Sequence, residues 1–436
     1  MPTRPEQRFV PTGTTAEPLI DVRGLEVHYG LRGGALGRLL GRDSGTVKAV
    51  DGVDLQLRRG EVLGLVGESG SGKTTLGRAL LGLAPATDGS ILFRDRDIAT
   101  MGSRERREVR RHIQMAFQDP NAALNPSMTI EDAVGDALRV HGIGTAAERR
   151  ARVAETLERV GLSPVEMFLG KYPRDLSGGQ KQRVVLARAI ILDPEVLVAD
   201  EPISMLDMSV RAKILQLMLD LKKDLGLTYV YITHDLASAK YFCDRIAIMY
   251  LGRIVEIGPT EEIFASPRHP YTKALLGAIP DPDPERSVVR DLPRGEIPDA
   301  AAPPAGCSFH PRCPVAVAEC GWEGRDLRAL LETHWTRRTP EEYAEEARLV
   351  GDLAHLDAPG EHVVHLGAGG AAEVRGFLDG LREREADPLW NGVESMTDEG
   401  AGVRIAFRGG VDPQLRRAGG AEVACVLYPE TEPGAG

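Results

Sequence analysis

The sequence predicts an α/β fold that carries a C-terminal extension. One apolar run, Val62–Val66, passes through a glycine-rich loop into a helical pattern that begins at Lys73. A second apolar run, 196–199, has the length and composition of a buried strand. Past about residue 285 a proline-rich stretch leads into a region of different character. A chain of 436 residues is long for one hydrophobic core, so we expect two or three domains.

Composition and charge narrow the class of protein. A hydrophobic fraction of 42% with mixed charge is typical of a globular chain, and the net charge of −11 argues against a nucleic-acid partner. The N-terminus lacks the apolar core of a secretory signal, and no apolar run reaches the roughly 18 residues that span a bilayer. We therefore expect a cytoplasmic protein, in which a structural disulfide is disfavoured.

The loop 67–74 has the pattern G-x-x-x-x-G-K-T. Its glycines allow backbone N–H groups to close around phosphate oxygens, and the helix that follows adds a favourable dipole. Lys73 would reach the β- and γ-phosphates, while the Thr74 hydroxyl would bind Mg²⁺. The alternative is a glycine-rich turn without a ligand, but the strand before it and the helix after it favour nucleotide binding.

Two further stretches carry candidate chemistry. The run 196–199 ends in Asp200, which suits a Mg²⁺ shell, and Glu201, which could polarise an attacking water. The stretch "LSGGQKQR", 176–183, offers a hydroxyl and backbone amides at a helix start, which is a second anion site. Paired acids after a strand and capped turns are common, so neither stretch is decisive alone.

Taken together, residues 18–280 resemble the ATP-binding subunits of ABC transporters, with the family's motifs in order. The resemblance implies an ABC-type P-loop ATPase domain, with a RecA-like core and a helical subdomain. It implies an adenine-stacking Tyr29, a Q-loop glutamine Gln118 that touches Mg²⁺, a Walker B Asp200, a catalytic Glu201, a D-loop ending in Asp207 and a switch histidine His234. The Walker A residues are Gly67, Ser69, Gly70, Ser71, Gly72, Lys73, Thr74 and Thr75, and the signature residues are Ser177, Gly178, Gly179 and Gln180.

The family architecture also implies partners. Two such domains dimerise head to tail, so that Ser177 and Gly179 would close on ATP held by the other subunit, which is a second copy or a paralogue. Two membrane permease subunits and an extracytoplasmic substrate-binding protein complete such importers, which places the chain at the cytoplasmic face of the membrane. The cofactors implied are ATP and Mg²⁺.

Three stretches resemble the subfamily that imports dipeptides and oligopeptides. These are "FQDPNAALNPSMTI" around the Q-loop, the insertion between Tyr29 and the next strand, and "SPRHPYTKALLGAIPDPDP" from Ser266. Close relatives of this subunit also serve oligosaccharide, nickel and glutathione importers, which remain alternatives. A soluble ABC ATPase of DNA repair or translation is an alternative of another class, but one motif set without long heptads argues against it.

Three of the five cysteines lie within residues 306–320. Cys307, Cys313 and Cys320 are too widely spaced for a zinc ribbon, and Cys425 would bring the set to four thiolates, the number that an iron–sulfur cluster takes. Some peptide-importer ATPases resembled here hold a [4Fe–4S] cluster in a similar tail. We therefore expect a structural [4Fe–4S] cluster, with free thiols or zinc as the alternatives. Cys243 is expected to pack in the core.

The C-terminal region has signals for local structure but none for function. The predicted division is an ATP-binding domain at 18–280, a proline-rich and cysteine-containing segment at 281–325, and an α+β extension at 326–436. "TPEEYAEEARLV" predicts a helix with Thr339 as N-cap, Pro340 at its first position and a capping box to Glu342. A second helix is expected in "GGAAEVRGFLDGLRERE", and short strands in "HVVHL" and "VRIAF". The glycine-rich "HLGAGGAAE" is interpreted as a turn before a helix.

Overall fold

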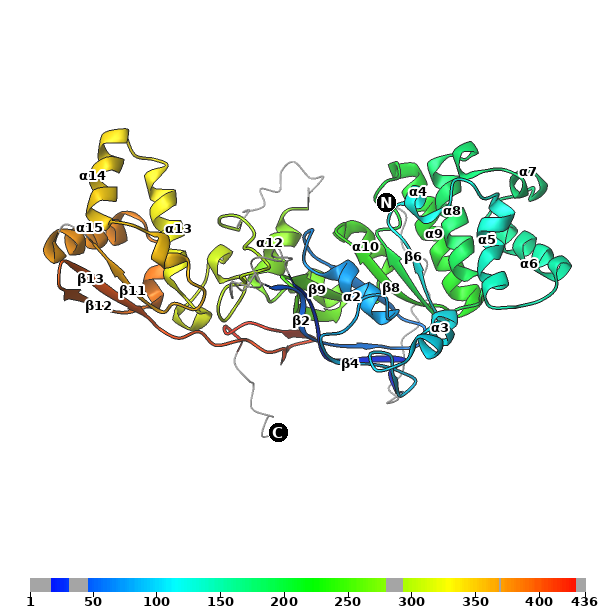
Figure 1. The fold of residues 1–436 in the computed structure, drawn as a ribbon, viewed down its shortest axis with the longest axis horizontal. Coiled ribbons are helices and arrows are strands. Elements are labelled where there is room, and N and C mark those ends of the chain that lie inside the picture. Colours follow the sequence, from blue (N-terminus) through cyan, green and yellow to red (C-terminus); the bar gives the residue numbers. More distant parts are fainter. Residues whose placement is uncertain (1–16, 31–45, 280–292, 368–369, 429–436) are drawn as a thin grey trace, which may run out of the picture.

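The computed structural model describes residues 17–30, 46–279, 293–367 and 370–428. Parts of three sequence features lie outside these residues: the insertion after Tyr29 at 31–45, the proline-rich stretch at 280–292, and the glycine pair 368–369. Figure 1 shows an elongated molecule with helices gathered at one end, a small mixed α/β unit at the other, and two larger sheets between them.

The largest sheet positions the candidate site. Its strands are β3 (Val62–Val66), β6 (Ile113–Ala116), β7 (Val196–Asp200), β8 (Thr228–Thr233), β9 (Arg245–Tyr250), β10 (Arg253–Pro259), β14 (Arg416–Ala418) and β15 (Ala421–Val423). Their order is β14-β15-β10-β9-β3-β8-β7-β6, with β9 to β6 parallel and β10, β15 and β14 antiparallel. Every residue of β3, β7 and β8 is buried, as expected for parallel strands covered on both faces.

A second, antiparallel sheet lies against the first. It contains β1 (Ile20–Gly30), β2 (Thr46–Leu57), β4 (Asp88–Phe93) and β5 (Arg96–Asp97), in the order β2-β1-β4-β5. Helix α2 (Lys73–Leu80) follows β3, and its Leu76 and Leu80 share one apolar cluster with residues of both sheets. The start of α2 is therefore fixed between two layers.

Some of the other helices lie beside the large sheet and others form a separate group. They are α3 (Ser103–His112), α4 (Pro120–Ala123), α5 (Ile130–Val140), α6 (Ala146–Arg159), α7 (Glu166–Leu169), η1 (Pro173–Asp175), α8 (Gly178–Ile190), α9 (Met208–Leu225), α10 (Leu236–Phe242), α11 (Thr260–Ala265) and α12 (Pro270–Gly277). Figure 1 shows α4 to α8 gathered at one end of the molecule. Apolar residues of α5, α6 and α8, such as Leu138, Leu157 and Val184, pack in one buried cluster.

The small α/β unit at the other end follows two short helices, η2 (His310–Arg312) and η3 (Ala318–Cys320). It comprises α13 (Gly324–Trp335), α14 (Pro340–Val350), η4 (Ala354–Asp357), β11 (Val363–Leu366), α15 (Ala371–Arg384), α16 (Leu389–Gly392), β12 (Val393–Glu399) and β13 (Gly402–Phe407). The predicted helix at 340–350 is confirmed, with the capping box between Thr339 and Glu342. The helix over 371–384 and the strands at 363–366 and 402–407 are confirmed as well.

The chain then returns to the large sheet. Strand β15 pairs with β10 through Glu256 and Val423, so the last described strands belong to the sheet that holds the candidate site. The predicted domain ranges, 18–280, 281–325 and 326–436, stay a prediction. Within the residues described here, no helix combines the length and apolar character needed to cross a bilayer.

Candidate functional site

The glycine-rich loop joins β3 to α2. Gly70 and Gly72 have φ angles of 80° and 98°, which residues other than glycine rarely adopt. A Cβ on Gly72 would lie 2.0 Å from the Ala49 carbonyl oxygen. Ser69 and Gly70 are exposed at the tip of the loop, Ser71 is buried, and Thr75 is half-buried in the first turn of α2. The sequence therefore produces the exposed, tightly turned loop that phosphate binding requires.

Lys73 folds back over this loop. Its Nζ donates to the carbonyl oxygens of Gly67 at 2.8 Å and Glu68 at 2.7 Å. Burial lowers the pKa of Lys73, while the carboxylates of Glu201, Asp200 and Glu68 act to raise it. The ammonium thus lies among acceptors that phosphate oxygens could replace.

Thr74 and Asp200 meet at the start of α2 and the end of β7. The Thr74 hydroxyl donates to Asp200 Oδ1 at 3.0 Å, and burial raises the pKa of the Asp200 carboxyl. Hydroxyl and carboxylate oxygens are the ligands that Mg²⁺ prefers, so this pair fits the predicted metal position.

The three candidate catalytic side chains lie together. Glu201 Oε2 accepts from Gln118 Nε2 at 3.0 Å, and Glu201 Oε1 lies 3.0 Å from His234 Nδ1. Glu201 and His234 follow β7 and β8, which are parallel neighbours and therefore end at the same edge of the sheet. The backbone of Glu201 has a φ of 45°, in the left-handed region that residues other than glycine rarely adopt.

The signature residues lie at the start of α8. Ser177 Oγ accepts from the Gln180 backbone N at 3.4 Å, and Gln180 Oε1 accepts from the Ser177 backbone N at 2.9 Å. Ser177 and Gly178 are exposed, and Gly179 packs so closely that a Cβ there would lie 2.8 Å from Val210 Cγ1. Figure 1 shows α8 in the helical group, apart from α2, so one chain does not bring the signature to its own phosphate loop.

Two predicted nucleotide contacts are peripheral in this structure. Tyr29 is 44% exposed at the end of β1, with its ring available to a ligand. Asp207 caps α9 by accepting from the Val210 backbone N at 3.0 Å, and this hydrogen bond lowers its pKa. Sequence reasoning missed Glu68 in the phosphate loop and its two partners, Tyr271 and Arg312. The signal in the sequence that could have indicated these contacts is Glu68, an acidic residue inside a phosphate-binding loop.

Comparison with known proteins decides the family. Residues 50–204 match the family model described as ABC transporter, and residues 255–320 match the one described as oligopeptide/dipeptide transporter, C-terminal region. A peptide import ATP-binding protein of Brucella ovis is 47% identical over 321 residues, which cover 74% of this chain and 97% of that protein. The chain belongs to the ABC transporter family.

Two further relatives of this ABC protein carry the same type of name. The oligopeptide transport ATP-binding protein AppF of Bacillus subtilis is 42% identical over 74% of this chain and 98% of its own length. The oligopeptide transport ATP-binding protein OppF of Salmonella typhimurium is 45% identical over 72% of this chain and 92% of its own length. The ABC ATP-binding fold implied by the sequence motifs is therefore confirmed.

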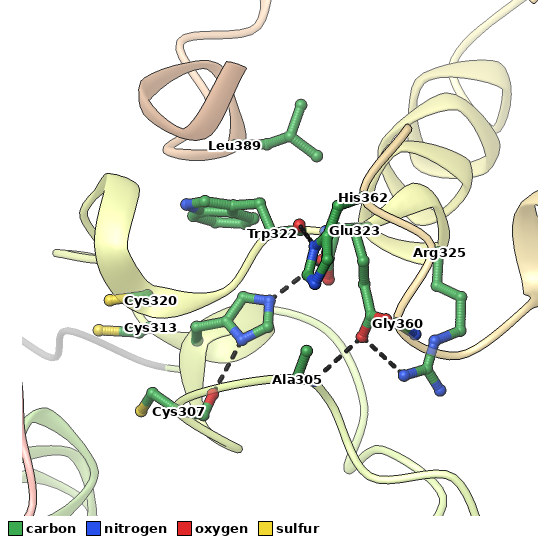
Figure 2. Close-up of polar contacts among 12 residues, drawn as sticks. Ala305, Cys307, Cys313, Cys320, Trp322, Glu323, Arg325, Gly360, His362 and Leu389 are labelled. Carbon is green, nitrogen blue, oxygen red and sulfur yellow. Dashed lines mark hydrogen bonds and ion pairs between the residues drawn. The ribbon is translucent and has the colours of Figure 1, made fainter. Parts of the chain in front are cut away.

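The iron–sulfur interpretation is wrong. Cys307, Cys313, Cys320 and Cys425 do line one cavity of about 10 Å³, and Figure 2 shows the first three on neighbouring turns. However, within the described ranges no group of three or more His, Cys, Asp or Glu side chains is arranged to hold a metal ion. Burial raises the pKa of the Cys313 and Cys425 thiols to about 11.

The cavity has room for about one water molecule. We therefore describe the four residues as buried free thiols that pack as small apolar groups. Cys243 is 1% exposed in the core, as predicted.

Proposed function

We propose that this ABC subunit hydrolyses ATP to energise the import of dipeptides or oligopeptides through separate permease subunits. The observation that carries the ATPase part is the position of Glu201, held between Gln118 and His234 beside the Thr74–Asp200 pair. The peptide part is supported by the relatives named for peptide import and by the match of residues 255–320.

The geometry supports the following sequence of events. Lys73 leaves the loop carbonyls for the β- and γ-phosphates, while the N–H groups of residues 67–75 close around them. Thr74 and Asp200 would hold Mg²⁺, whose charge would neutralise that of the phosphates. Glu201 then orients and polarises the attacking water, and Gln118 and His234 hold its carboxylate in place.

The second half of the site comes from a partner. Since Ser177 and Gly178 are exposed and lie on α8, apart from α2, they suit an ATP molecule bound by another subunit, either a second copy or a paralogue. The hydroxyl and backbone N–H groups at this helix start favour an anion. Tyr29 would stack on adenine, and Asp207 would lie at the junction between the two subunits.

The remaining partners are two permeases and an extracytoplasmic substrate-binding protein, with this chain at the cytoplasmic face of the membrane. The segment after Gln118 is a candidate contact with the permeases, because its residues Asn125, Pro126 and Ser127 are exposed and Gln118 itself contacts Glu201.

The test is reconstitution of the chain with its permeases and binding protein in proteoliposomes. We expect ATP-dependent uptake of labelled dipeptides or oligopeptides and ATPase activity that rises when peptide is supplied. An assembly that hydrolyses ATP but takes up an oligosaccharide, nickel or glutathione instead would overturn the peptide assignment. A purified chain that neither binds nor hydrolyses ATP would overturn the proposal as a whole.

A further inference from the structure

An arginine beyond the ATP-binding domain contacts the phosphate loop. Arg312 lies in η2, immediately before Cys313, and its side chain is 10% exposed. Its Nη1 lies 2.9 Å from Glu68 Oε2, and its Nη2 lies 3.3 Å from Glu68 Oε1. A bidentate contact of this kind fixes both distance and direction.

The same loop residue has a second anchor. The Glu68 backbone N donates to the Tyr271 hydroxyl at 2.9 Å, and Tyr271 is fully buried in α12. The Arg312 guanidinium also lies 5.8 Å from the ring centroid of Tyr250 and 5.9 Å from that of Phe309. Glu68 is thus held through both its main chain and its side chain.

Glu68 is also the residue whose carbonyl oxygen accepts a hydrogen bond from Lys73 Nζ. Glu68 is also an acid in a loop that must bind a polyphosphate, so an unpaired carboxylate there would repel the ligand. Pairing with Arg312 neutralises this charge and fixes the loop in one position.

The turn that carries Arg312 is also fixed to the C-terminal α/β unit. His310, two residues earlier in η2, is fully buried, and its Nε2 lies 3.1 Å from Asp326 Oδ2 near the start of α13. Next to it the buried Glu323 accepts from the backbone N of Ala305 at 3.1 Å and of Gly360 at 2.6 Å, as Figure 2 shows. The short helix η2 therefore connects the phosphate loop to the C-terminal unit.

We infer that Arg312 and Tyr271 are positioning residues for ATP binding, and that Arg312 completes the phosphate loop from the segment beyond the ATP-binding domain. The inference rests on the proposed function, because it concerns the affinity of the same site. Neither residue touches the catalytic group formed by Glu201, Gln118 and His234, so ATP affinity is the quantity they control.

The test measures KM and kcat for ATP hydrolysis, and Kd for a fluorescent ATP analogue, with the full chain. We expect Arg312→Gln to raise KM and Kd about tenfold, as expected for loss of one charge-assisted contact, and to change kcat less than twofold. Arg312→Lys should recover part of the affinity. Glu68→Gln combined with Arg312→Gln should recover most of it, because the unpaired carboxylate is gone.

The matched control is Arg294→Gln. Arg294 pairs with Asp387 and donates to the Cys313 carbonyl, so its side chain fixes the same segment through groups outside the phosphate loop. Its KM should stay within twofold of the wild-type value. Should Arg312→Gln fail to fold, Tyr271→Phe removes a single hydroxyl and should raise KM about threefold.

The outcomes separate the two proposals. Wild-type KM and Kd in a folded Arg312→Gln or Tyr271→Phe variant would overturn the inference. The inference would also be overturned if Arg312→Gln loses ATP affinity, Glu68→Gln does not restore it, and Arg294→Gln loses affinity to the same extent. That combination would show a general structural role. A wild-type chain without ATP binding would instead overturn the proposed function.

Discussion

Glu201→Gln replaces a carboxylate by an amide of nearly the same shape. In the wild type, Glu201 Oε2 accepts from Gln118 and Oε1 faces His234 Nδ1, both at 3.0 Å. The amide oxygen can still accept from Gln118, and the amide nitrogen can donate to a neutral His234. We therefore expect the fold and the site geometry to survive the change.

The expected fall in turnover follows from the loss of the Glu201 carboxylate as a general base. A positioned general base contributes about 10²–10⁴ in rate, so turnover should fall by that factor, or about 3–5 kcal/mol in the barrier. ATP affinity should change less than about threefold, because Lys73, Thr74 and Asp200, and not Glu201, are the groups placed for phosphate and Mg²⁺. The variant should accumulate as an ATP-bound dimer.

The assay is phosphate release at saturating ATP and Mg²⁺, together with light scattering of the protein with and without ATP. The matched control is Glu195→Gln, which removes a carboxylate that pairs with Arg59 and Arg94 just before β7, away from the edge where Glu201 lies. Turnover of the Glu201 variant within threefold of the wild type would refute the reasoning, and so would an equal loss in the control.

Three further predictions concern other parts of the chain. Lys73→Ala should weaken ATP binding at least thirtyfold, measured by titration with a fluorescent analogue, and unchanged affinity would contradict its role. Pro126→Glu, at an exposed position, should reduce peptide uptake in proteoliposomes by tenfold or more with basal ATPase kept within twofold, and coupled uptake at the wild-type level would exclude that surface. Burial lowers the pKa of His269 to about 3 from 6.5, so its neutral form stabilises the fold above pH 6.5 and this contribution is lost as pH falls toward 3. At pH 5 the free energy of unfolding should be lower by about 2 kcal/mol. In His269→Asn, which can still cap α12, the free energy of unfolding should fall less steeply with decreasing pH. Parallel plots of this free energy against pH for the variant and the wild type would refute the assignment.

Local signals in the sequence predicted local structure well. The strand at 62–66, the helix start at Lys73 and the strand that ends at Asp200 are confirmed, because the glycines and apolar runs act within a few residues. Helix α13 was missed although Leu327, Leu330, Leu331 and His334 follow a helical spacing.

Contacts between distant residues could not be predicted in the same way. Nothing near Arg312 indicates that its partner is Glu68, and nothing near Val423 indicates that it pairs with Glu256. The cysteine spacing allowed several arrangements, and the sequence alone could not show which of them the fold adopts. Leu124, which lies in the segment proposed to contact the permeases, is buried at 2% exposure, so only its neighbours can serve as contacts.

The pairing of β15 with β10 has a consequence for synthesis of the chain. During translation, β10 leaves the ribosome long before β15, because the whole α/β unit is made between them. Until then, one edge of β10 offers unpaired N–H and C=O groups, which other strands can add to. Domains generally fold as units as they emerge from the ribosome. The β10 edge of the ATPase sheet therefore stays unpaired until residues near the end of the chain have been synthesised. Aggregation during expression should therefore be most severe for chains that stop before residue 421.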